Sequence, residues 1–143
     1  MSRAKRMDPI VRLARDDEEQ AARGLSESAR MLRESETKLE ELRDYRSGYA
    51  RQLQSQGTLN GNALQGFQQF MRNLDQAIAQ LEERVRQQRR ANDQHVQRWM
   101  GSHNRTKAMT EIADKYRHEE QRIEEDKLQW ELDDRAQHTK PKI

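Results

Sequence analysis

The stretch of sequence that decides the fold is Leu64–Val85, LQGFQQFMRNLDQAIAQLEERV. Its large apolar residues recur at alternating steps of three and four: Leu64, Phe67, Met71, Leu74, Ile78, Leu81 and Val85. This alternation gives the a and d positions of a coiled-coil seam. The seven-residue spacing continues towards the C-terminus through Met109, Tyr116, Ile123 and Trp130. The pattern predicts a long amphipathic helix that packs against a second helix.

An earlier segment carries the same register. Its a positions are Val11, Glu18, Leu25, Leu32, Leu39, Arg46 and Leu53, and its d positions are Ala14, Ala21, Ser28, Ser35, Leu42 and Tyr49. Asp8 before Pro9 is a helix start signal, with Asp as the N-cap and Pro at the first helical position. The segment 55–62, SQGTLNGN, is rich in turn-forming residues. We expect helices over about 9–54 and about 63–138, joined by a loop at 55–62, in a single coiled-coil domain spanning 1–143.

One short loop between two long helices predicts an all-α, antiparallel two-helix coiled-coil hairpin. With the turn near residue 58, the numbers of facing residues are expected to sum to about 117. The first helix then ends opposite residue 106, and residues 107–139 overhang by roughly 50 Å at about 1.5 Å per residue. This overhanging C-terminal helix carries an apolar stripe that it cannot bury alone. Either a second copy of the chain or another partner is expected to cover it.

Composition excludes several classes of protein. Charged residues make up 36% of the chain and hydrophobic residues 32%, which is too little apolar material for an ordinary globular core. No apolar run approaches the length of a membrane span, and no apolar stretch follows the basic N-terminus as it does in a secretory signal. The chain has no Cys, so disulfides and thiol nucleophiles are excluded.

No catalytic constellation, phosphate-binding glycine loop or paired metal-ligand spacing occurs in the sequence, so we expect neither an enzyme nor a cofactor. His95 falls in the seam near Gln88 and Asn92. These residues form either a polar layer that fixes the register or a ligand or proton-switch site. The basic N-terminus is short and lacks interleaved aromatic residues, so we expect no nucleic-acid binding.

One edge of the predicted hairpin is aromatic where charges are usual. Tyr45 and Phe70 both fall at g positions. Their residue numbers sum to 115, near the value expected for facing residues, so we expect the two side chains to lie close together. On the opposite edge, Arg43 is expected to pair with Asp75. The aromatic edge has two interpretations. Either it adds packing that widens the seam, or it is an exposed surface that binds a partner.

These residues resemble the flagellar FliJ family. The resemblance rests on Leu42-Arg43-Asp44-Tyr45 with Tyr49, on Phe67-Gln68-Gln69-Phe70, on Leu74-Asp75-Gln76-Ala77-Ile78 and on the plan of two unequal helices around a Gly/Asn turn. It implies a role in flagellar biogenesis, as a soluble cytoplasmic component of the type III flagellar export apparatus at the inner face of the basal body membrane. It also implies a stalk-like coiled coil that binds the hexameric FliI export ATPase and the FlhA export gate and escorts export chaperones. Membrane association through the gate is then peripheral.

The resemblance also assigns candidate binding residues. The family's gate-binding face maps onto Leu42, Tyr45, Tyr49, Phe70, Leu74 and Ala77. The paired chain ends are expected to enter the ATPase ring, with Met109, Tyr116, Ile123 and Trp130 as the contacts. Lys38 and Leu81 depart from the Gln and His of the family pattern, and Leu81 fits a seam d position instead. The alternatives are a passive coiled-coil scaffold, a stalk protein of virulence-type secretion and a chaperone for unfolded cargo.

Overall fold

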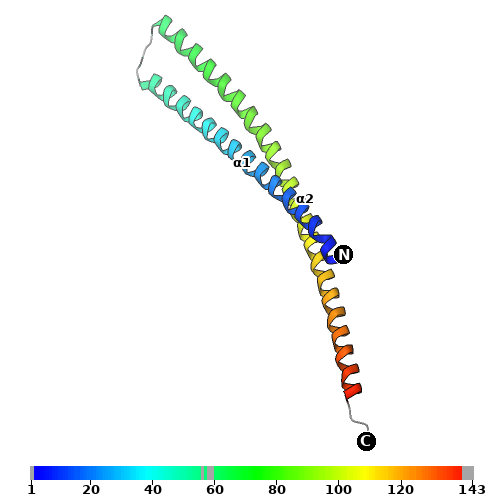
Figure 1. Cartoon of the computed structure of the whole chain (residues 1–143). Coiled ribbons are helices and arrows are strands. Elements are labelled where there is room, and N and C mark those ends of the chain that lie inside the picture. Colours follow the sequence, from blue (N-terminus) through cyan, green and yellow to red (C-terminus); the bar gives the residue numbers. More distant parts are fainter. Residues whose placement is uncertain (1, 56, 58–59, 140–143) are drawn as a thin grey trace. The chain divides into compact units, whose positions relative to one another are not determined.

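The chain is described by a computed structural model over residues 2–55, 57 and 60–139. Two helices account for nearly all of this part, α1 over Arg3–Ser55 and α2 over Gly61–Thr139 (Figure 1). The described residues contain no strand. The protein is therefore all-α, and its two long helices pack together along the predicted seam.

The start of α1 differs from the prediction. The helix begins at Arg3, and Pro9 lies inside it. Ser2 caps its first turn, because the Lys5 amide donates to Ser2 Oγ and the Arg6 amide donates to the Ser2 carbonyl, both at 3.1 Å. Burial of Met7 adds a packing reason for the first turns to be helical. Asp8 and Pro9 therefore do not mark the boundary.

The turn lies between Ser55 and Gly61, within the predicted loop. Of that loop, residues 56, 58 and 59 lie outside the described part of the chain, as do residues 140–143. Gly57 has a φ of +77°, a conformation that costs glycine less than other residues. The start of α2 is fixed by Asn60, whose Oδ1 accepts a hydrogen bond of 2.8 Å from the Ala63 amide.

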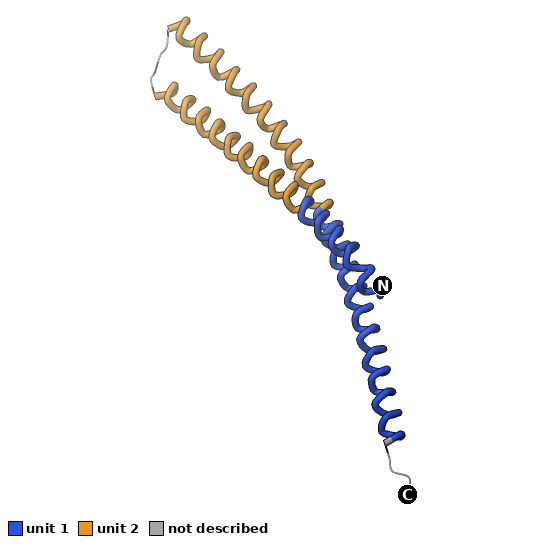
Figure 2. The backbone as a smooth tube through the Cα atoms, viewed as in Figure 1, with its two compact units in different colours: residues 1–21, 99–143 blue, residues 22–98 orange. Residues whose placement is uncertain are grey.

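The helices divide into two compact units, coloured separately in Figure 2. Unit 2 comprises residues 22–98. Its buried core is formed by Leu39, Leu74, Ile78 and Val85, with Leu32, Leu42, Phe70 and Leu81 packed against it. All these residues except Phe70 are predicted a or d positions. Because Tyr45 contacts Phe70 while Gly24 lies against His95, the two helices run antiparallel in this unit.

Unit 1 comprises residues 1–21 and 99–143. Its core is formed by Met7, Val11 and Ala113, with Met109 and Tyr116 packed against them. Thr106 Oγ1 donates to the Ala14 carbonyl at 3.0 Å, whereas the earlier Ala4 amide donates to the later Glu120, so the helices also run antiparallel here.

The register of the hairpin differs slightly from the prediction. Ala14 lies opposite Thr106, and Gly24 lies opposite His95. The residue numbers of these facing positions sum to 120 and 119, whereas the sequence predicted about 117. The earlier start of α1 also lets the Ala4 amide reach Glu120 Oε1 at 3.2 Å. The expectation that α2 is uncovered from residue 107 onward is therefore wrong for the segment up to Glu120.

The seam of unit 2 includes the predicted polar layer. Gln88, Asn92 and His95 are half-buried, and neither Gln88 Oε1 nor Asn92 Oδ1 has a hydrogen-bond partner among the described residues. Gly24 lies opposite this layer, where a Cβ atom would lie 3.2 Å from His95 Nδ1. The missing side chain at Gly24 therefore leaves room for the imidazole of His95.

Two glycines of α1 offer a matched test of this contact. Gly48→Ala is expected to raise the free energy of unfolding by about 0.5–1 kcal/mol, because alanine favours the helix and a Cβ at this position meets nothing within 4 Å. Gly24→Ala has the same propensity gain but must displace His95, so we expect it to add little or no stability. Chemical denaturation followed by circular dichroism measures both. Equal gains at the two positions would contradict close packing of His95 on Gly24.

Candidate partner-binding surfaces

Four rings gather where the two helices of unit 2 approach the turn, and we call Tyr45, Tyr49, Phe67 and Phe70 the aromatic cluster. Tyr49 stacks on Phe67 with ring centroids 5.3 Å apart and planes 7° apart, and its centroid lies 4.6 Å from that of Phe70. Tyr45 contacts Phe70 edge-on at 6.3 Å, which confirms the predicted proximity of these two residues. The cluster therefore joins both helices at one edge of the seam.

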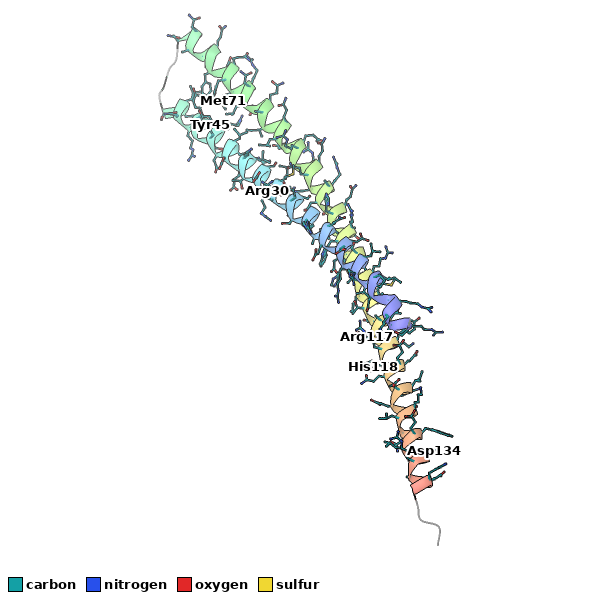
Figure 3. The ribbon with its side chains drawn as sticks, viewed as in Figure 1. Arg30, Tyr45, Met71, Arg117, His118 and Asp134 are labelled. Carbon is teal, nitrogen blue, oxygen red and sulfur yellow. The ribbon has the colours of Figure 1, made fainter. Side chains whose placement is uncertain are left out.

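The members of the cluster differ in exposure. Tyr45 is 54% exposed, whereas Tyr49, Phe67 and Phe70 are half-buried. Figure 3 shows Tyr45 on α1, and Met71 on the neighbouring stretch of α2. Tyr45 is thus the ring whose surface is most available to a partner, while Tyr49 lies between the two phenylalanines and contributes mainly to packing.

A groove of about 470 Å³ opens beside the cluster. Its walls are formed by Tyr49, Gln52, Leu53, Ala63, Gly66, Phe67 and Phe70. Phe67 and Leu53 are not among the predicted gate-binding residues. The sequence assigned both to the seam as d and a positions, and their repeat gave no sign that the helices leave a groove between them near the turn.

The other predicted gate-binding residues have different surroundings. Leu74 is 9% exposed and belongs to the core, and Leu42 packs against that core. Ala77 is half-buried and lines a separate groove with Gln80, Leu81 and Arg84. The structure thus brings Tyr45, Tyr49 and Phe70 into one cluster, supports them with Leu42 and Leu74, and places Ala77 on a neighbouring groove.

Charge pairs connect the helices near the aromatic cluster, but with partners other than the predicted one. Asp75 pairs with Arg46, and Arg43 instead donates from Nη2 to Glu82 Oε1 at 3.2 Å. The hydrogen bond from Arg46 lowers the pKa of Asp75 below its ordinary value. The predicted Arg43–Asp75 pair is wrong, because the long side chain of Arg43 reaches along the helices to Glu82 while Arg46 takes Asp75.

The predicted ATPase-binding residues lie in unit 1 and fall into two pairs. Met109 and Tyr116 are half-buried against Met7 and Val11, and the guanidinium carbon of Arg3 lies 5.8 Å from the centre of the Tyr116 ring. Ile123 and Trp130 are 66% and 78% exposed. They lie in residues 121–138, the C-terminal segment, in which every side chain is exposed.

Two features are absent from the part of the chain that the structure describes. None of its helices has the length and apolar character needed to cross a lipid bilayer. Its His, Asp and Glu side chains form no group of three or more that is placed to hold a metal ion.

The family model described as flagellar FliJ protein matches residues 3–140, which is nearly the whole chain. Neither the curated proteins nor the solved structures contain a match.

Proposed function

The chain belongs to the FliJ family of non-enzymatic flagellar export components, and on this premise we propose that the chain is a stalk between the FliI export ATPase hexamer and the FlhA export gate. It acts in the cytoplasm, peripherally at the inner face of the basal body membrane, and it escorts export chaperones. Its role is mechanical, since it presents separate side-chain surfaces to two partners.

Binding of the ATPase is assigned to the C-terminal segment. The observation that supports this assignment is the exposure of Ile123 and Trp130, large apolar side chains in a segment with no buried residue. The first turn of α1 is bonded to Glu120, immediately before this segment. In the proposal, residues 121–138 extend past α1 and enter the centre of the ring.

Met109 and Tyr116 are poor targets for testing this proposal. Both pack against Met7 and Val11, so that their replacement lowers stability as well as any affinity. Ile123 and Trp130 are exposed and can be changed without removing a core contact.

The test is the double variant Ile123→Ala with Trp130→Ala. We expect its affinity for the purified export ATPase to fall by about tenfold or more, because buried aromatic anchors dominate protein interfaces. Its helical content and melting temperature should remain those of the wild type. Isothermal titration calorimetry measures the affinity and circular dichroism measures the fold.

Leu64→Ala is the matched control, since Leu64 is 41% exposed but lies in unit 2. It should bind the ATPase as the wild type does. Unchanged affinity of the double variant would contradict the assignment and would favour a passive coiled-coil scaffold.

Binding of the gate is assigned to Leu42, Tyr45, Tyr49, Phe70, Leu74 and Ala77. The exposed ring of Tyr45 and the adjoining groove support this assignment. The packed residues Leu42 and Leu74 then act by holding the rings in place.

A further inference from the structure

The C-terminal segment is apolar on more than its predicted stripe. Besides Ile123 and Trp130, Leu128 and Leu132 are 59% and 52% exposed. Four large apolar side chains thus remain in water within ten residues. A single helix that exposes this much apolar surface gains stability whenever another surface covers it.

The charge of the segment restricts what can cover it. Residues 121–138 contain six acidic and three basic residues, a net charge of −3. Asp134, labelled in Figure 3, lies near its end. Two such segments side by side would bring like charges together, which disfavours direct pairing of one segment with another. The charge favours a basic surface that also carries exposed apolar side chains.

The first turns of α1 have this character. Residues 1–15 contain five basic residues and one acidic residue, a net charge of +4. Ile10 and Leu13 are 44% and 64% exposed, and Arg6 is exposed as well. Arg6, Ile10 and Leu13 are spaced by four and three residues, so they share one face of the helix.

We propose that the chain forms a homodimer in which the C-terminal segment of each copy packs on the Arg6–Ile10–Leu13 face of the other. Ile123 and Trp130 lie seven residues apart and so share one face of the segment. This face then covers Ile10 and Leu13, and the acidic segment lies along the basic turns. The two contacts are identical and reciprocal, as in an interface with two-fold symmetry, so the assembly closes at two copies. Both surfaces belong to unit 1.

The homodimer has a consequence for the proposed function. It covers Ile123 and Trp130, which are the side chains assigned to the ATPase. The dimer is therefore a resting form that cannot bind the ATPase through this segment. This consequence rests on the proposed function, whereas self-association itself is measured on the isolated chain and does not depend on it.

The first experiment measures the mass of the full chain by sedimentation velocity over a range of concentrations. We expect a monomer–dimer equilibrium that shifts towards monomer between about 0.05 M and about 0.5 M salt, because salt screens exposed charges. Leu13→Ser should raise the dimer dissociation constant about tenfold. Leu64→Ser, at an exposed position in unit 2, should leave it unchanged. A wild-type chain that stays monomeric under all conditions overturns the proposal.

The second experiment identifies the contact. Because the chain has no Cys, Leu13→Cys and Trp130→Cys each introduce a single thiol. Mixing the two variants under mild oxidation should give a disulfide-linked heterodimer in preference to either homodimer. Leu64→Cys should not link to Leu13→Cys. A dimer that links only 130 to 130, or links 13 and 64 as readily as 13 and 130, overturns the proposed pairing.

Discussion

Val85→Asp is expected to destroy the packing of unit 2. Val85 is 2% exposed and belongs to the cluster of Leu39, Leu74 and Ile78 that joins the two helices. A carboxylate at this site loses its hydration without gaining a partner, which costs several kcal/mol. The described residues of the unit contain no second buried cluster to compensate. We expect the melting temperature, followed by circular dichroism, to fall far enough that the cooperative transition is lost.

Ala79→Asp is the matched control for this substitution. Ala79 lies on the same helix, six residues before Val85, and its side chain is exposed. The same carboxylate there should change the melting temperature little, because it stays hydrated. If both variants melted like the wild type, the helices would not be held together by this seam.

The second large effect is expected at Tyr45. Tyr45→Ala should reduce binding to the cytoplasmic part of the export gate by about tenfold or more, because it removes the most exposed ring of the aromatic cluster. Stability should change little. Tyr49→Ala should reduce both gate binding and the melting temperature, since Tyr49 stacks on Phe67 and contacts Phe70. Titration of the gate domain and thermal melts separate the two effects.

Tyr45→Phe is the control that keeps the ring and removes only the hydroxyl, and it should retain most of the gate affinity. The packing interpretation of the aromatic edge predicts a different outcome. In that case Tyr45→Ala lowers the melting temperature as much as Tyr49→Ala does, and the correctly folded fraction binds the gate normally.

Much of the fold follows from the sequence because a coiled-coil seam is a local, repetitive pattern. Every predicted a and d position of α1, from Val11 to Leu53, is buried or half-buried. The proximity of Tyr45 and Phe70 also follows, since the heptad fixes which edge each occupies. These predictions need only the helical period and an antiparallel partner.

Other features depend on information that the repeat does not contain. The register differs from the predicted one by two or three residues, and the carboxylate that each arginine reaches depends on its side-chain conformation, so that Arg43 pairs with Glu82 and Arg46 with Asp75. The start of α1 depends on the cap at Ser2 and on the burial of Met7. Together these errors misplaced the boundary between covered and exposed parts of α2.

The candidate binding surfaces were predictable only in part. Spacing identified Tyr45 and Trp130 as apolar residues in need of a partner, and both are exposed. It could not separate Trp130, which is exposed, from Tyr116, which packs against Met7 and Val11, because both occupy the same position of the repeat. Nor could it show the groove beside Phe67, which depends on the separation of the helices near the turn.

The central claim is that this chain serves flagellar protein export, and the most direct measurement is export by a strain that lacks its gene. The amount of hook and filament protein in the culture medium is determined by immunoblotting, with and without the gene restored on a plasmid. We predict that export falls several-fold without the gene and recovers when the wild-type chain is supplied. Normal export in the absence of the chain would contradict the claim.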